Sequence, residues 1–134
     1  GVYAANDGTG GGAIAAMKAA GIDVTKIPTT GQDAELAATQ RVLAGEQFMN
    51  VYKALKEEAE VAAQAAVALA NGTTPANATA KVNNGTADIA SILLTPVAVT
   101  ADNVKDTVIA DGFWTAADVC TGTYAKACTA AGIS

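Results

Sequence analysis

Histidine is absent from this 134-residue chain, and cysteine occurs only twice. A zinc site takes four ligands, mostly from Cys, His and carboxylates, so we expect no metal site here. Without histidine and without a nucleophile-elbow serine, acyl-transfer chemistry of the triad type has no support. The longest apolar run, residues 65–70, is far shorter than the ~18 residues that a membrane-spanning helix needs.

Basic residues are also scarce, because 8 Lys and Arg face 13 Asp and Glu, for a net charge of −5. Nucleic-acid affinity depends largely on clustered Lys and Arg that neutralise phosphates, so nucleic acid is not an expected partner. The same charge disfavours binding to an anionic membrane surface. Hydrophobic residues make up 51% and charged residues 16%, which indicates a globular domain, and aromatics are only 4%, so its Ala-rich helices should pack closely.

The chain alternates between short apolar runs and helical periodicity, which is typical of βα units in a parallel sheet. Asp33 is the expected N-cap of the second helix and Thr100 that of the fourth. We expect strands at 2–5, around 27 and at 48–53, helices at 13–20, 34–44, 54–70 and 101–110, a glycine-rich turn at 6–12, a loop at 73–88, an extended stretch at 89–99, and short helical pieces at 115–132.

Polar side chains follow the expected strands where each strand ends. Asn6 and Asp7 follow the first strand, Gln32 and Asp33 the second, and Lys53 the third. Ligands of open α/β sheets bind outside the carboxyl ends of the strands, and these groups suit sugar hydroxyls. Lys53 could donate to a sugar oxygen or neutralise Asp33. The alternative is structural: the first four would be turn or cap residues, and Lys53 a solvated strand end.

Two catalytic interpretations fail on this pattern. Residues 8–13 fit a loose G-x-G-x-x-A pattern, but Pro28 stands where a dinucleotide fold needs an acidic residue. Asp7 and Asp33 could form a glycosidase pair, but nothing in the sequence builds an apolar pocket that would raise one pKa. We therefore expect no enzymatic activity and no cofactor.

Cys120 and Cys128 lie eight residues apart near the C-terminus. On one continuous helix they would be about 12 Å apart, too far to bond. The Thr-Gly-Thr at 121–123 breaks the helix, so a disulfide is the expected state, with two buried thiols as the alternative.

Several motifs, in order along nearly the whole chain, resemble the periplasmic sugar-binding proteins of ABC importers, above all their D-xylose-binding branch. The resemblance lies in residues 3–9, 11–14, 31–36, 51–53, 82–85, 93–97, 102–109 and 111–113.

The resemblance implies an α/β fold of the type I periplasmic-binding-protein kind, in which two lobes clamp a monosaccharide. It implies that Asn6, Asp33 and Lys53 bind the sugar, whereas Trp114 should serve packing. It divides the chain into βα units of the C-terminal lobe (1–53), a helix and loop that pack on an N-terminal lobe (54–88), and a crossover strand, closing helix and disulfide-bearing tail (89–134). The implied partners are a sugar and an ABC permease, in an extracytoplasmic location, periplasmic or as a cell-surface lipoprotein.

The chain opens inside an apparent core strand, so we expect residues upstream to be missing and the chain to be a C-terminal portion. The helix at 54–70 would then lack its cover, and we expect an isolated chain to self-associate or to leave this helix mobile. Two other functions share the fold: the effector-binding domain of a LacI-type regulator and a sugar sensor that docks on a receptor. A disulfide would disfavour the cytosolic regulator.

Overall fold

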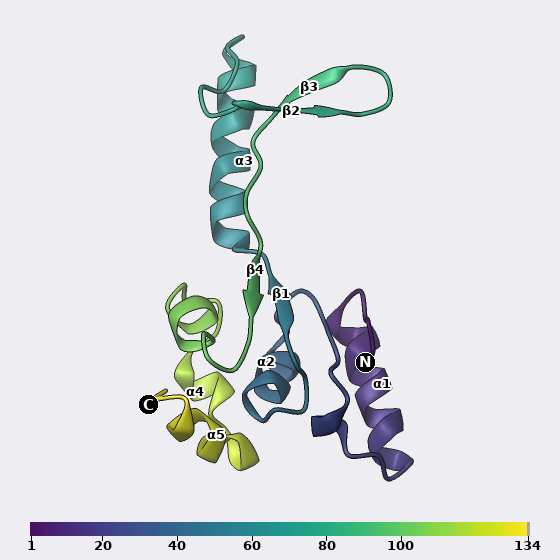
Figure 1. Cartoon of the computed structure of the whole chain (residues 1–134). Coiled ribbons are helices and arrows are strands. Elements are labelled where there is room, and N and C mark those ends of the chain that lie inside the picture. Colours follow the sequence, from purple (N-terminus) through teal and green to yellow (C-terminus); the bar gives the residue numbers. More distant parts are fainter. Residues whose placement is uncertain (134) are drawn as a thin grey trace. The chain divides into compact units, whose positions relative to one another are not determined.

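The computed structural model describes residues 1–133, which form two compact units. Unit 1 comprises residues 1–53 and 96 onward, and unit 2 comprises residues 54–95. The elements, drawn in Figure 1, are α1 (Asp7–Ala19), η1 (Val24–Lys26), α2 (Leu36–Leu43), β1 (Asn50–Tyr52), α3 (Leu55–Ala70), β2 (Ala80–Asn83), β3 (Asp88–Ser91), β4 (Val97–Val99), η2 (Lys105–Ile109), α4 (Ala116–Val119), η3 (Gly122–Tyr124) and α5 (Ala125–Ala130).

The centre of unit 1 is a narrow set of extended segments. Val2 bridges Thr29 and Gln32 bridges Val51, both in parallel orientation. β4 then pairs with β1 (Figure 1). The register is antiparallel and places Asn50 opposite Val99. The expected α/β class with parallel units is confirmed, although the first two segments are single bridges rather than regular strands.

Helix α1 begins earlier than predicted, because the glycine-rich residues expected as a turn form its first two turns. Asn6 caps the helix: its side-chain Oδ1 accepts hydrogen bonds from the Thr9 backbone N–H (2.9 Å) and hydroxyl (2.7 Å). Two glycines also permit close packing, since a Cβ on Gly10 would lie 3.0 Å from the Thr30 carbonyl oxygen. A Cβ on Gly11 would lie 3.2 Å from the guanidinium of Arg41. Tertiary contacts thus override the low helix propensity of glycine.

The segment between α1 and β1 differs from the prediction in two places. The strand expected around Ile27 is displaced, because η1 occupies Val24–Lys26 and the bridging residue is Thr29. The helix expected from residue 34 begins at Leu36, and its cap position holds Glu35, which makes no side-chain capping bond. Asp33 is therefore not the N-cap that the sequence predicted.

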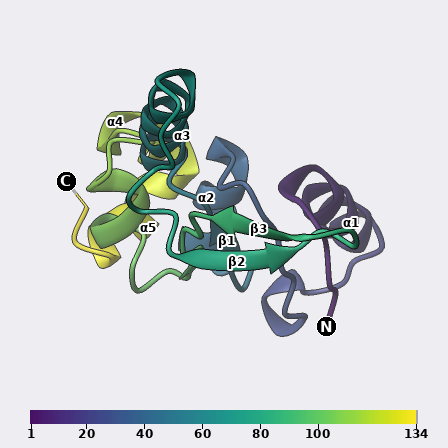
Figure 2. The same ribbon diagram turned by 90° about the horizontal axis from the view of Figure 1, so that it is seen from above.

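Unit 2 contains helix α3 and a β-hairpin. The helix matches the prediction closely, and none of its residues is buried within the described structure. The predicted loop at 73–88 is wrong in part, because β2 forms within it and pairs with β3 in antiparallel register (Figure 2). Asn83 lies opposite Asp88, and its side-chain amide donates to the Asp88 carboxylate over 2.8 Å. This cross-strand bond supports the hairpin end that the Asn- and Gly-rich sequence forms.

The tail after β4 is helical but irregular. The helix expected at 101–110 forms a π-helical turn instead, with the N–H of Ile109 donating to the Val104 carbonyl five residues back. Thr100 does not cap it with its side chain; its backbone N–H donates to the side chain of Asn103. The wider turn places Val104 and Val108 in the core, both fully buried. The short helical pieces predicted at 115–132 are confirmed as α4, η3 and α5.

The core of unit 1 is small and mostly aliphatic. Its largest fully buried apolar side chains are Ile14, Val42, Val99, Val104, Val108 and Val119, and Tyr52 and Leu43 are nearly as buried. Among residues 1–133, no helix combines the length and apolar character needed to cross a membrane.

Candidate functional site

The carboxyl edge of the parallel segments is where the predicted site residues lie. Asn6 follows the segment that contains Val2, Asp33 follows the segment that ends at Gln32, and Lys53 follows β1. The parallel bridges give these segments one direction, so their following residues emerge at one edge of the sheet. This is the edge at which open α/β sheets bind ligands.

Asp33 and Lys53 meet in an ion pair, with 2.8 Å between the lysine Nζ and the aspartate Oδ1. Their side chains remain 44% and 42% exposed. A half-exposed pair of this kind adds little to stability, on the order of 0–1 kcal/mol. The pair presents a carboxylate acceptor and an ammonium donor to solvent, next to each other. That combination can accept a hydrogen bond from one hydroxyl group and donate one to another oxygen of the same small polyol.

Asn6 is an exposed cap residue at the same edge. In the part of the chain that the structure describes, its side-chain hydrogen bonds involve only Oδ1, and both go to Thr9. The structure does not join Asn6 to Asp33 or Lys53 by a hydrogen bond or ion pair within residues 1–133. The Nδ2 group of Asn6 is a donor that a ligand could use without breaking the cap.

Asp7 and Gln32, the other strand-end candidates, differ from Asn6 and Asp33. Asp7 is buried with 1% exposure, and its carboxylate accepts hydrogen bonds from other parts of unit 1. Gln32 makes the parallel bridge, and its carbonyl oxygen accepts from the backbone N–H of Asp7 (3.0 Å). The structural alternative therefore holds for Asp7. Its burial also removes it from the pair that a glycosidase would need at a substrate.

The loop that carries Asp33 has an unusual backbone. Asp33 has φ +94° and Ala34 has φ +49°, and both are L-residues other than glycine. Such conformations cost on the order of 1–3 kcal/mol each and persist only where surrounding contacts impose them. Here the N–H of Asp33 donates to the Val51 carbonyl oxygen over 3.0 Å. The strain lies at the residue that projects the exposed carboxylate.

Aromatic side chains pack around the same loop. The indole Nε1–H of Trp114 donates to the Ala34 carbonyl oxygen over 2.8 Å, and its ring meets Phe113 edge-on at 5.6 Å between centroids. Phe113 in turn meets Tyr52 edge-on at 5.3 Å. Trp114 thus packs on the loop, as predicted. Burial, with the nearby Asp111 carboxylate as the second cause, raises the pKa of Tyr52 to about 12.

The cysteines form the predicted disulfide. Cys120 and Cys128 are bonded with their Cα atoms 5.7 Å apart, and Cys128 is buried. The bond joins the end of α4 to α5. Helix α2 is tied to this region by Gln40, whose Nε2 donates to the Val119 carbonyl oxygen over 3.1 Å.

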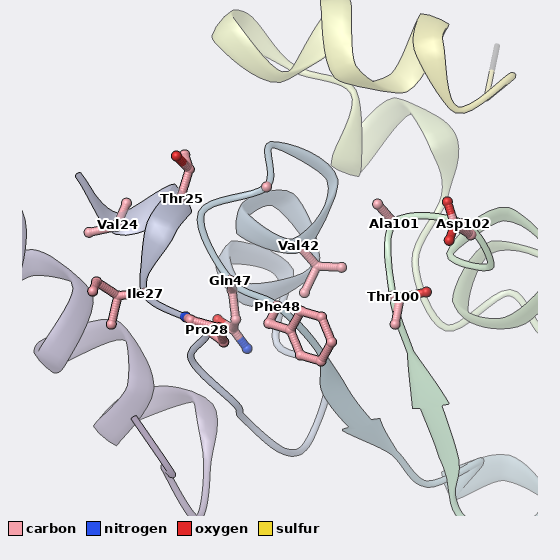
Figure 3. A pocket seen from close by; sticks show the side chains of 11 residues that line it. Val24, Thr25, Ile27, Pro28, Val42, Gln47, Phe48, Thr100, Ala101 and Asp102 are labelled. Atoms are coloured by element: carbon pink, nitrogen blue, oxygen red, sulfur yellow. The ribbon is translucent and has the colours of Figure 1, made fainter. Parts of the chain in front are cut away.

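A pocket of about 260 Å³ lies at the opposite edge of the sheet (Figure 3). Its lining residues precede the parallel segments or follow the antiparallel β4, as Pro28, Phe48 and Thr100 do. The lining is largely apolar, including Val24, Ile27 and Phe48, and suits sugar hydroxyls poorly. The pocket is therefore not part of the Asp33–Lys53 edge.

Comparison with known proteins identifies relatives of this chain. The chain is 50% identical over 112 residues to the D-xylose-binding periplasmic protein of Escherichia coli K12, a match that covers 84% of the chain and 33% of that protein. It is 45% identical over 114 residues to the D-xylose-binding periplasmic protein of Haemophilus influenzae, covering 85% of the chain and 34% of that protein. The chain thus spans about a third of the length of these relatives.

A solved structure is also similar. The carbohydrate transporter solute binding protein of Chloroflexus aurantiacus, in complex with D-glucose, superimposes with a TM-score of 0.77 at 37% identity. The superposition covers 87% of this chain and 34% of that one. The family described as the periplasmic binding protein domain matches residues 1–74, which is more than half of the chain. With this match, the chain belongs to the periplasmic binding protein domain family.

Proposed function

We propose that this chain supplies one side of a monosaccharide site in the solute-binding component of an ABC importer, with D-xylose or a similar sugar as ligand. The observation that carries the proposal is the half-exposed Asp33–Lys53 pair on a strained loop at the carboxyl edge of the parallel segments. Such a pair can hydrogen-bond neighbouring oxygens of a sugar, and Asn6 adds a third polar group at this edge. The D-xylose-binding relatives and the glucose-bound neighbour support this ligand class.

The rest of the proposal follows from the same function. The protein captures its sugar without chemical change, in an extracytoplasmic location, and delivers it to a membrane permease. The names of the relatives favour solute capture over transcriptional regulation. Asn6, Asp33 and Lys53 hydrogen-bond the sugar, and the groups that close the site from the other side come from a second lobe.

The test is a thermal-shift panel of pentoses and hexoses on the complete product of the encoding gene, followed by calorimetric titration of the sugar that gives the largest shift. Removing one charged hydrogen-bond partner costs about 1.5–3 kcal/mol, so Asp33→Asn and Lys53→Met should each weaken binding roughly 10- to 150-fold. The matched control is the surface ion pair Lys26–Asp23, 3.2 Å apart. Lys26→Met should leave the dissociation constant within twofold.

Two results would refute the proposal. One is a complete protein whose midpoint is unmoved by every sugar in the panel. The other is a sugar affinity that Asp33→Asn and Lys53→Met leave unchanged. Chromatography of the recovered sugar tests the non-enzymatic part, because a converted product would show catalysis.

We also propose the division of the chain that the family implies, in which residues 54–88 pack on the N-terminal lobe. Helix α3 has no buried residue, and its apolar Leu55 and Val67 are 52% and 62% exposed. In the isolated 134-residue chain we expect self-association or rapid amide exchange along α3. A monomer in sedimentation velocity together with full exchange protection of α3 would contradict this.

A further inference from the structure

A buried polar cluster lies beneath the loop that carries Asp33. It consists of Asp7, Gln47 and Asn50, each only 1% exposed, and we refer to it as the Asp7 cluster. Its members come from the first residue of α1, the segment before β1 and the start of β1. Buried polar side chains are costly unless they are hydrogen-bonded, and among residues 1–133 no buried side-chain nitrogen or oxygen lacks a partner.

Two side-chain amides of the cluster donate to the same carboxylate oxygen. Asp7 Oδ1 accepts from the Gln47 side-chain amide (3.3 Å) and from the Asn50 side-chain amide. Arg41 donates through Nε to Gln47 Oε1 over 3.1 Å, which fixes the orientation of the glutamine. The three side chains are thus joined through Asp7 Oδ1 into one hydrogen-bonded group.

The same cluster binds the backbone directly after Asp33. The Ala34 N–H donates to Asn50 Oδ1 over 2.9 Å, and the Glu35 N–H donates to Asp7 Oδ2 over 2.9 Å. The first amide belongs to Ala34, which has positive φ and directly follows Asp33, and the second belongs to the next residue, Glu35. The hydrogen bonds therefore compensate the strained conformation at the point where it occurs.

Gly31 shows how tightly the chain runs against the cluster. A Cβ at Gly31 would lie closer than 3.0 Å to both the Asp7 carboxylate and the Gln47 amide, a separation that real Cβ atoms essentially never show. The loop from Gly31 to Glu35 is thus held from beneath by side chains 12 or more residues away in sequence. The loop contains two charged side chains, Asp33 and Glu35, and Asp33 is the one that forms an ion pair with Lys53.

We propose that Asp7, Gln47 and Asn50 are positioning residues for the sugar site. They do not touch the ligand; they hold residues 33 and 34 in the left-handed region, so that the Asp33 carboxylate reaches Lys53 at the edge of the sheet. This inference rests on the proposed function, because it assigns the cluster a role in the affinity of that same site. A purely structural cluster would affect folding and leave the affinity of the folded protein unchanged.

Exchange of the donor and the acceptor provides the first test, in the complete product of the encoding gene. Asp7→Asn places two amides face to face, and Asn50→Asp places two buried carboxylates face to face. In the double variant, the new amide at position 7 can donate to the new carboxylate at position 50, and the remaining oxygens still accept from the Ala34 and Glu35 amides. Gln47 Nε2 loses its acceptor at position 7 and keeps the Met49 carbonyl oxygen, 3.3 Å away, so the restoration is partial. The matched control is Val119→Ala, a fully buried core truncation in α4 outside the cluster.

Sugar titrations at low temperature, on protein shown to be folded by circular dichroism, should give dissociation constants about tenfold higher in Asp7→Asn and Asn50→Asp. The double variant should recover part of this loss, and Val119→Ala should stay within twofold of the unaltered protein. If a single variant does not fold, Gln47→Met, which removes a peripheral bond of the cluster, takes its place with a smaller expected increase. Unchanged affinity in the folded cluster variants would overturn the proposal.

A second readout does not depend on sugar and uses the 134-residue chain. Amide exchange at Ala34 and Glu35, and the amide–Cα proton couplings of Asp33 and Ala34, report the bonds and the positive φ angles. We expect exchange at these two amides to quicken at least tenfold in the cluster variants and not in Val119→Ala. If the unaltered protein binds no sugar, the proposed function fails by itself, and unchanged exchange in the cluster variants would also overturn the positioning role.

Discussion

The environment of Gly31 leads to a sharp prediction about stability. Gly31→Ala introduces a methyl group where the Asp7 carboxylate and the Gln47 amide already stand. Overpacking of this kind costs about 1–3 kcal/mol, and a displaced buried polar group that loses its partner costs about 1–3 kcal/mol more. We therefore expect the free energy of unfolding of unit 1 to fall by about 2–6 kcal/mol.

Gly12 provides the matched control, because the same substitution there meets no atom within 4 Å. It lies inside helix α1, where alanine stabilises relative to glycine by roughly 0.5–1 kcal/mol. Gly12→Ala should therefore raise the free energy of unfolding slightly. The two variants make the same chemical change and differ in the space around it.

Urea unfolding followed by the fluorescence of Trp114 is the suitable assay. This is the single tryptophan of the chain, and its indole donates to the Ala34 carbonyl oxygen, so its emission reports unit 1 beside the altered loop. The reasoning is refuted if Gly31→Ala unfolds within about 0.5 kcal/mol of the unaltered chain, or if Gly12→Ala destabilises as much as Gly31→Ala.

Two further predictions concern the phenol and the disulfide of unit 1. The folded protein holds the pKa of Tyr52 at about 12, against an ordinary 10.0. The neutral phenol therefore stabilises the fold fully below pH 10. This contribution of roughly 2–3 kcal/mol is lost as the pH rises from 10 through 12. Tyr52→Phe should remove the step near pH 12 from an ultraviolet titration, and a titration curve unchanged by the substitution would contradict the assignment. The Cys120–Cys128 disulfide joins residues eight apart in sequence. Its reduction should lower the free energy of unfolding by about 2.5 kcal/mol in the chain-entropy account. Denaturant curves with and without reductant measure this, and coincident curves would show that the tail holds without its covalent bond.

Local patterns predicted the elements whose stability is local. Helix α3 was predicted almost to the residue, because its Ala- and Glu-rich run has high propensity and an acidic first turn. Gly21 and Gly45 correctly marked the ends of α1 and α2, and both have positive φ. The disulfide was predicted from the break between the two cysteines.

Elements that depend on distant contacts were predicted less well. The start of α1 was missed because the propensity of glycine argues for a turn, whereas the reason for helix lies 20 to 30 residues away, at the Thr30 carbonyl and the Arg41 guanidinium. The hairpin strand β2 was missed because it is only four residues long, is mostly exposed, and lies in an Asn-, Thr- and Gly-rich stretch that indicates a loop.

The candidate site divides in the same way. The positions of Asp33 and Lys53 at one edge could be predicted, because strand ends mark that edge in any parallel arrangement. The supporting Asp7 cluster could not, since Gln47 and Asn50 give no periodic signal and join Asp7 across more than 35 residues of sequence. The faint sequence signal is a polar pair that flanks Phe48 and Met49 ahead of a core strand.

Because β1 pairs with β4, unit 1 could be encoded as a continuous chain without unit 2. Tyr52 lies opposite Val97, so Lys53 and Pro96 leave the two antiparallel strands at the same end. Two antiparallel strands in this register can be joined by a tight turn of two to five residues. Replacing residues 54–95 with an Asn-Gly turn would thus give a shorter continuous chain that keeps the aliphatic core, the disulfide and the polar edge. Such a module could be recombined with the remaining parts of related proteins.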